Sequence, residues 1–297
     1  MSVTETPMDD PDAMHHGLTS RQMAFYRFRR NPLAVIGALI VLSVVIAAVF
    51  APWIAPSPES AGSFVDFRNR HAAPTWAHPM GTDNVGRDVF SRVLFGYRVS
   101  LGLVVGVLGV AVPFGVVLGL VAGYFGGWIE TIVMRFTDIM LALPPLAMAL
   151  AITAVLSPNL VNAMIAITLL WWTWHTRLIY RIVKAQMNED YVEAARVAGA
   201  SHAHILFREL LPNCFSAVAV KISLDAGFVI LFGAALSFLG LGVQPPTPDL
   251  GTMVATGSEY LPEMWWQAVM PGLAILYAIL GFNLLGDGLR DMLHVDL

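Results

Sequence analysis

The sequence predicts an all-α membrane protein with six transmembrane helices, and three observations support this. Hydrophobic residues make up 57% of the 297 and charged residues 13%, whereas soluble domains average about 45–50% and about 25%. The apolar residues are gathered in runs close to the ~20 residues that a helix needs to cross a bilayer. Proline, glycine and polar clusters separate these runs, as expected of the connections between spans.

The N-terminal part of the chain holds one expected span between two polar segments. Residues 1–20 are polar and acidic and predict a disordered tail. Residues 21–32 carry four arginines among aromatic residues, which indicates a basic flank at the membrane surface. Residues 33–51 are uncharged and form the first span. Residues 52–98 form a long polar loop rich in turn-forming residues.

Five further spans make up the expected core, residues 99–297. The first of them is rich in glycine and other small residues, which allow helices to pack closely. Pro144 and Pro145 predict a kink in the next span. A turn at Gly126 and Gly127 precedes it. The expected core spans are 99–124, 128–156, 160–182, 215–243 and 266–285, with a proline-rich loop at 244–266 and a short tail at 286–297.

Basic residues predict the orientation of the chain in the membrane. Six spans put both termini on one side, and the four arginines before the first span place that side in the cytoplasm. The connection between the fourth and fifth spans then also faces the cytoplasm, and it is rich in basic residues. Residues 244–266 carry neither Lys nor Arg, as an outside loop should. The five arginines of the 52–98 loop argue the other way, and we let the N-terminal cluster decide.

The longest polar interruption, residues 191–213 within a predicted cytoplasmic coupling loop at 184–214, predicts two helices joined by a glycine turn. The composition of residues 189–198 favours a helix, and Gly199 is expected to end it with a positive φ. Ser201 can cap a second helix. Pro212 is expected to end that second helix.

This segment resembles the EAA loop of ABC-importer permeases. The residues that carry the match are Glu193, Ala194, Ala195, Gly199, Leu211 and Pro212, while position 209 is Glu where that family has Ile. Most of the remaining chain is similar to the second, C-type membrane subunit of dipeptide, oligopeptide and nickel importers. The motifs that carry this similarity are FRRNPLAVIG, HPMGTDNVGRDVFSRVLFGYRVSL, GYFGGW, DIMLALPP, LSFLGLGVQPPTP and PGLAILYAILGFNLLGDGLRD.

The resemblance implies a type I ABC-importer permease fold in the cell inner membrane. It implies three kinds of partner besides the lipid: a second homologous permease, two ATP-binding subunits and an extracytoplasmic solute-binding protein. ATP and Mg would be bound by the partner subunits, with no cofactor in this chain. The cargo would be peptides, and a nickel chelate or an oligosaccharide remains open. The residues implied in coupling to the ATPase are Tyr191, Glu193, Ala194, Ala195, Gly199, Ala200, Leu211 and Pro212.

Composition and motifs argue against several other functions. A net charge of −4 makes nucleic acid an unexpected partner. The chain has no Gly-rich P-loop ending in Gly-Lys-Ser/Thr and no HExxH or GxSxG motif, so we expect neither ATP binding nor a catalytic site here. His202 and His204 are two apart on a helix and make a poor metal pair, and Cys214 is the single cysteine. An ion-coupled carrier, a channel or a membrane enzyme remain the alternatives from other classes.

Polar and aromatic side chains inside spans are candidates for the transport pathway. Arg135 and Asp138 are three apart and are expected to pair with each other. Asp225 could line the pathway, pair with Lys221 one turn earlier, or be solvated at the membrane interface. The aromatic cluster in the fourth span could be a packing belt or a surface on which a substrate stacks. The pathway candidates are therefore Trp171, Trp174, His175 and Asp225.

The carboxylate of Glu193 is expected to form an ion pair with a basic residue of an ATPase partner. Its neighbours Ala194 and Ala195 are small, so another protein can approach closely and partly desolvate the charge. The alternative is a local pair with Arg196, three residues on.

Overall fold

The computed structural model describes residues 26 and 28–293, so the predicted disordered tail at 1–20 and the last four residues lie outside it. The described chain is helical, and its only β pairing is an isolated antiparallel bridge between Thr82 and Asp88. Its elements are α2 Pro32–Val49, α3 Ala51–Ile54, η2 Pro58–Ala61, η3 Phe67–Asn69, α4 Val89–Phe125, α5 Gly127–Ala142, α6 Pro145–Val155, α7 Leu160–Gln186, α8 Asp190–Val197, α9 His202–His204, η4 Ile205–Leu210, α10 Leu211–Phe238, α11 Leu250–Ser258 and α12 Trp266–Leu293.

Four or five helical stretches of the described chain are long and apolar enough to cross a bilayer. Four are single helices: α2, α4, the continuous run from His202 to Phe238 that ends in α10, and α12. The fifth is the pair α5 and α6, which is bent by 87°. Helix α7 has 27 residues but is less apolar than these. The predicted membrane-spanning character is therefore confirmed, and the predicted number of six is reached only if α7 also spans.

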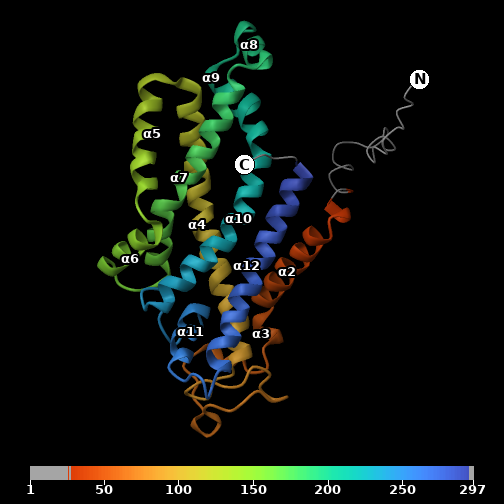
Figure 1. Ribbon diagram of the computed structural model, residues 1–297, viewed down its shortest axis with the longest axis vertical. Helices are drawn as coiled ribbons and strands as arrows, with labels where there is room; N and C mark the ends of the chain where they lie inside the picture. Colours follow the sequence, from red (N-terminus) through yellow and green to blue (C-terminus); the bar gives the residue numbers. More distant parts are fainter. Residues whose placement is uncertain (1–25, 27, 294–297) are drawn as a thin grey trace, which may run out of the picture.

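The long helices form two packed groups. In the first group α4 lies along α7, α5 packs on both of these helices and α6 packs on α7; in the second, α12 packs on α2, α10 and α11. Figure 1 shows the first group beside the second, with the long helices running roughly along the molecule. The groups meet where α4 touches α10 and α2, and the direct contact between α7 and α10 is limited. The apolar core lies mainly between α4, α7 and α10.

Glycines bring α4 and α7 into close contact. A Cβ added at Gly115 would lie 2.5 Å from the carbonyl oxygen of Trp172, and one at Gly119 would lie 2.7 Å from Cβ of Ile179. Gly123 faces α7 in the same way. These three glycines recur every fourth residue, so they line one face of α4. The predicted close packing of this span is confirmed, because the helix backbones approach where side chains are absent.

The boundaries of two elements differ from the prediction. Helix α4 begins ten residues before the expected position 99, because Asp88 caps it and its side chain accepts a hydrogen bond from the backbone N–H of Ser91 at 2.7 Å. The expected loop at 244–266 contains the short helix α11, which Asp249 caps in the same way through Thr252. The polar loop that was expected at residues 52–98 is therefore shorter, and it covers residues 55–88 between α3 and α4.

The prolines in the third expected span break it rather than kink it. The chain leaves α5 after Ala142 and enters α6 at Pro145, with Leu143 and Pro144 in extended conformations. Proline disfavours the helical conformation of the residue before it, and two successive prolines extend this effect. The 87° bend that results turns α6 across the end of the first helix group (Figure 1).

Candidate functional site

The polar segment at 184–214, called here the coupling segment, lies at one end of the molecule, opposite the loops around α11 (Figure 1). Its first helix, α8, matches the predicted helix at 189–198. Gly199 follows with φ +77°, as predicted, and beyond the adjacent residues no atom lies within 4 Å of a Cβ placed there. The hydroxyl of Ser201 then accepts a hydrogen bond from the backbone N–H of His204 at 3.3 Å, so the predicted cap is confirmed.

The prediction that Pro212 ends the second helix is wrong. The chain stays helical from His202 to Phe238, and Pro212 lies in the first turn of α10. Directly before it the helix widens to a π-helix over Ile205–Leu210. Proline clashes with the carbonyl four residues earlier in a regular α-helix. The wider turn supplies the local adjustment that lets the helix continue.

The coupling segment is seated on the ends of α4 and α7 by an apolar cluster. Val192 of α8 and Ile205 and Leu210 of η4 are fully buried there. They pack against a set of side chains from the two long helices and from the start of α10. That set is Leu120, Tyr124, Ile179, Val183 and Cys214. The segment is therefore held in place by burial and not only by its covalent links.

Polar contacts also hold the coupling segment against the ends of α4 and α7. The hydroxyl of Tyr191 donates to Oε1 of Gln186 at 3.0 Å and accepts from Nδ2 of Asn213 at 3.1 Å, so it joins the two ends of the segment. Burial raises the pKa of the Tyr191 hydroxyl, which keeps it protonated for these contacts. The hydroxyl of Tyr124 lies 2.7 Å from Nδ1 of His202. The second histidine of the segment, His204, has a different partner: its Nε2 lies 3.4 Å from Oε1 of Glu209.

The outer face of α8 is free within the described chain. Glu193 and Ala194 are exposed, and Val197 is 84% exposed. The side chain of Glu193 has no ion pair or hydrogen bond with any residue that the structure describes. Beside it lies an open hollow of about 550 Å³. The hollow is lined by Met187, Asn188, Glu193, Arg196 and Val197.

The structure separates the predicted coupling residues into two sets. Those that face the apolar seat are partly buried, and those that face outward are exposed. The first set is Tyr191, Ala195, Ala200 and Leu211. The second set is Glu193, Ala194, Gly199 and Pro212.

The predicted pathway candidates lie inside the chain. Trp171, His175 and Asp225 are all less than 4% exposed, and Trp174 is half-buried. The ring of Trp171 packs 5.0 Å from that of Trp174 and 5.2 Å from that of Phe232. This arrangement agrees with the packing-belt interpretation of the aromatic cluster.

Asp225 joins two basic side chains within the helices. Its predicted ion pair with Lys221 is present, one turn earlier on α10. Its second oxygen lies 3.0 Å from Nε2 of His175 on α7, a close electrostatic approach rather than an aligned hydrogen bond. The sequence identified both residues but gave no sign that they meet, because they are 50 positions apart.

Two further charge pairs join α5 to α7, and one corrects a prediction. Asp138 pairs with Arg177 instead of Arg135. Arg135 and Asp138 are close in sequence, but the guanidinium of Arg177 comes from the helix that packs beside α5. Near the coupling segment, Glu130 pairs with Lys184 at 2.7 Å and accepts a hydrogen bond from Tyr180.

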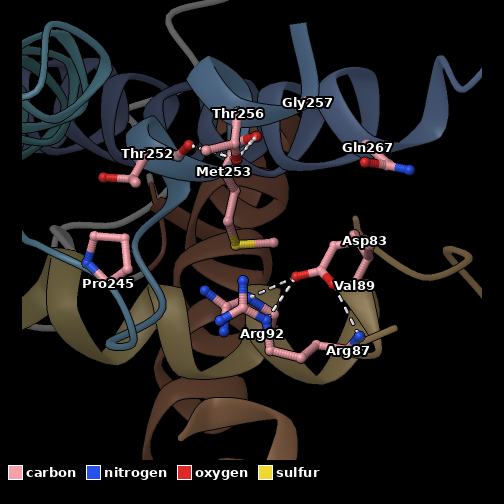
Figure 2. A pocket seen from close by; sticks show the side chains of 10 residues that line it. All are labelled: Asp83, Arg87, Val89, Arg92, Pro245, Thr252, Met253, Thr256, Gly257 and Gln267. Atoms are coloured by element: carbon pink, nitrogen blue, oxygen red, sulfur yellow. Dashed lines mark hydrogen bonds and ion pairs between the residues drawn. The ribbon is translucent and has the colours of Figure 1, made fainter. Parts of the chain in front are cut away.

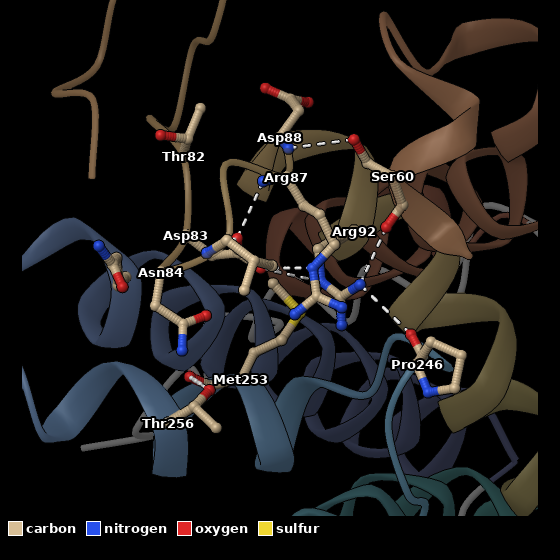
Figure 3. A network of polar contacts seen from close by, with 12 residues as sticks. Ser60, Thr82, Asp83, Asn84, Arg87, Asp88, Arg92, Pro246, Met253 and Thr256 are labelled. Atoms are coloured by element: carbon tan, nitrogen blue, oxygen red, sulfur yellow. Dashed lines mark hydrogen bonds and ion pairs between the residues drawn. The ribbon is translucent and has the colours of Figure 1, made fainter. Parts of the chain in front are cut away.

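At the opposite end of the molecule, residues 55–88 and 244–265 form what we call the loop cap. Arg92 is its centre: the side chain is 4% exposed, and Nη1 donates to the carbonyl oxygens of Ser60 at 2.9 Å and Pro246 at 3.3 Å (Figure 3). A second arginine, Arg87, lies close by. The carboxylate of Asp83 lies between the two guanidinium groups, 2.7 Å from Nε of Arg87 and 3.8 Å from Nε of Arg92. Arg92 therefore ties α4 to both loops.

A small cavity lies between this network and α11. It measures about 30 Å³, room for about two water molecules. Figure 2 shows Met253 reaching from α11 toward Arg92 across it. The cavity is too small for a peptide, so the loop cap carries packing and charge rather than a substrate pocket. Within the described residues no group of three or more His, Cys, Asp or Glu side chains is arranged to hold a metal ion.

Comparison with known proteins agrees with this architecture. Residues 115–296 match the family described as binding-protein-dependent transport system inner membrane component. Residues 19–74 match the N-terminal TM domain of oligopeptide transport permease C.

Individual relatives match along nearly their whole length. The chain is 41% identical over 303 residues to the di/tripeptide transport system permease protein of Pseudomonas aeruginosa, covering 100% of this chain and 98% of that protein. It is 44% identical over 289 residues to the dipeptide transport system permease protein of Escherichia coli K12, covering 94% of each. The chain therefore belongs to the inner membrane components of binding-protein-dependent transport systems, and it is a C-type ABC-importer permease.

Proposed function

We propose that this chain forms half of the transmembrane pathway of an ABC importer for dipeptides or oligopeptides. Six spans are proposed: α2, α4, the bent pair α5 and α6, α7, α10 and α12. Helix α7 qualifies by length, because 27 residues at 1.5 Å each rise about 40 Å, more than the ~30 Å hydrocarbon core. An even number of spans puts both termini on one side, and the positive-inside rule makes that side the cytoplasm.

The peptide cargo is supported by the relatives that match most of the chain. The names of those from Pseudomonas aeruginosa and Escherichia coli refer to di/tripeptide and dipeptide transport. The identity of about 40% extends over both helix groups.

The observation that carries the proposal is the coupling segment. Its exposed helix face carries a carboxylate that pairs with none of the described residues, and its buried face packs on the ends of α4 and α7. A partner protein that binds and displaces such a segment would also displace the long helices on which the segment packs. The proposed partner is a pair of ATP-binding subunits, which would bind ATP and Mg, while a second homologous permease would complete the pathway. Each state needs different contacts at this segment, or ATP could not shift the equilibrium between them.

The loop cap is the proposed receiving surface for an extracytoplasmic solute-binding protein. Trp76 is fully exposed and Phe67 is 64% exposed on its outer side. Large exposed aromatic side chains are enriched in protein interfaces. The buried network around Arg92 gives this surface a fixed shape.

Copurification and uptake test the proposal together. The tagged chain, expressed with its genomic neighbours, should copurify with one further permease and two ATP-binding subunits. In proteoliposomes that complex should take up dipeptides only with ATP inside and the binding protein outside. Uptake by the chain alone, driven by an ion gradient, would support a carrier and reject the importer.

A further inference from the structure

A charged cluster bridges the two helix groups inside the membrane-spanning part of the molecule. Asp225 and Lys221 belong to α10 in the second group, and His175 belongs to α7 in the first. The side chains of His175 and Asp225 are 0% and 1% exposed. Charges buried within spans are costly, so their presence indicates a function beyond packing.

The position of His175 is fixed by α4. Gly115 of α4 approaches so closely that a Cβ added there would lie 2.8 Å from Cβ of His175. The next residue, Thr176, donates a hydrogen bond to the carbonyl oxygen of Gly115 at 3.1 Å. The imidazole is thus presented to Asp225 by two helices of the first group at once.

The cluster lies where a mechanical connection between the groups is needed. The coupling segment joins the end of α7 to the start of α10, so a push on it loads one helix of each group. Direct contact between α7 and α10 is limited elsewhere. The contact of His175 with Asp225 is therefore well placed to keep the two helices from sliding past each other.

We propose that His175, Asp225 and Lys221 are positioning residues that tie α7 to α10, so that displacement of the coupling segment moves both helix groups as one body. The inference rests on the proposed function, in which ATP-binding subunits push on that segment. Lys221 keeps the charge of Asp225 compensated, and His175 makes the cross-group contact.

Replacing His175 tests the tie without disturbing the ion pair within α10. His175→Leu removes the polar contact and introduces an apolar side chain of similar length. His175→Gln introduces a polar amide whose N–H groups can approach Asp225. The assembled complex is placed in proteoliposomes, and the ATP hydrolysed per peptide taken up is measured. His175→Leu should raise this ratio about fivefold or more. His175→Gln should stay close to the unsubstituted protein.

The charge pair between Asp138 and Arg177 is the matched control, because both residues lie in the first helix group. Asp138→Asn combined with Arg177→Gln should leave the ratio unchanged. An unchanged ratio in His175→Leu, or an equal rise in this control, would overturn the tie. If His175→Leu does not assemble, Lys221→Gln combined with Asp225→Asn replaces it, with the same expected rise and the same contrary outcome.

Failure of the proposed function would look different. The unsubstituted complex would then lack ATP-dependent peptide uptake, before any variant is compared. If only the proposed role of the contact between His175 and Asp225 is wrong, that uptake stays intact. His175→Leu and the control then give the same ratio of ATP hydrolysed to peptide taken up.

Discussion

The guanidinium carbon of Arg196 lies 5.7 Å from the ring centroid of Tyr124, so α8 is attached to the end of α4 by a cation–π contact. The same guanidinium donates to the sulfur of Met187 at 3.5 Å. Arg196 is thereby turned away from the local pair with Glu193 that the sequence allowed. Glu193 keeps its charge available for a partner.

Glu193→Ala should weaken association with the ATP-binding subunits more than Glu189→Ala does. Loss of one member of a desolvated pair costs about 2–5 kcal/mol, whereas an exposed pair contributes about 0–1 kcal/mol. Glu189 is a matched control, because it precedes α8 and its side chain makes no capping bond. Uptake and copurification measure the effect. Equal behaviour of the two variants would argue against an intersubunit pair.

Gly199→Val should disrupt coupling while membrane insertion stays intact. The φ of +77° costs a residue with a side chain about 1–2 kcal/mol, and a β-branched residue more. Beyond the neighbouring residues a Cβ there would meet no atom within 4 Å, so the cost comes from the local backbone and not from packing against other parts of the protein. Gly199→Asn should therefore be much milder, because Asn tolerates this region. Uptake and copurification that are normal in the Val variant would contradict the argument.

Gly119→Ala should destabilise the first helix group, by about 1–3 kcal/mol for an overpacked contact. The added methyl would lie 2.7 Å from both Cβ of Ile179 and the carbonyl oxygen of Thr176, where neither helix can yield without shifting. Gly109→Ala on the same helix is the control, since nothing lies within 4 Å of its Cβ. Thermal unfolding in detergent distinguishes the two. Equal melting temperatures would mean that α4 and α7 separate easily.

A cysteine at position 76 should react with an impermeant maleimide from outside intact spheroplasts, and one at position 197 only after lysis. Trp76 and Val197 are both exposed. They belong to the loop cap and to α8, which lie at opposite ends of the molecule (Figure 1). Asn84 in the same loop is a poorer site, because it is half-buried and its amide lies 3.5 Å from the hydroxyl of Tyr260. Cys214→Ser supplies the background. The reverse labelling pattern would invert the proposed orientation.

Acidification should loosen the loop cap through His71. Burial, together with the charge of Arg70, lowers the pKa of His71 below its usual 6.5. The folded protein therefore favours the neutral ring, which lies 2.7 Å from the amide of Gln267. This stabilisation is complete above pH 6.5 and is lost as the pH falls through the lowered pKa. Hydrogen exchange in residues 66–83, expressed relative to the intrinsic exchange rate at each pH, should quicken as the pH falls below 6.5. His71→Gln should remove this dependence.

Signals that act over a few residues were read correctly from the sequence. The Gly199 turn and the cap at Ser201 each depend on the local backbone alone. The effect of Pro144 and Pro145 was placed correctly but underestimated, because the predicted kink is a break between two helices. The prediction that Pro212 ends a helix was wrong because the π-helical turn before it relieves the clash that proline usually causes. No single residue type in the sequence indicates such a turn.

Contacts between distant helices were beyond the sequence. The pairing of Asp138 with Arg177, and of His175 with Asp225, depends on which helices are neighbours. A charge in a span predicts that some partner exists, and the nearest residue in sequence was the natural choice. The choice of Lys221 as the partner of Asp225 was right, and the choice of Arg135 as the partner of Asp138 was wrong.

The π-helical segment at Ile205–Leu210 absorbs one extra residue without changing the direction in which α10 presents its later side chains. A π-helical turn holds about one residue more than an α-helical turn for the same full rotation. Deleting one residue within this turn would let it close as a regular α-helix, and Asp225 would still face α7. Deleting one residue from the regular part of α10 before Asp225 would turn that side chain by about 100°, away from α7. The same one-residue deletion is therefore expected to be tolerated in the π-helical turn and to misalign the membrane span a few residues later.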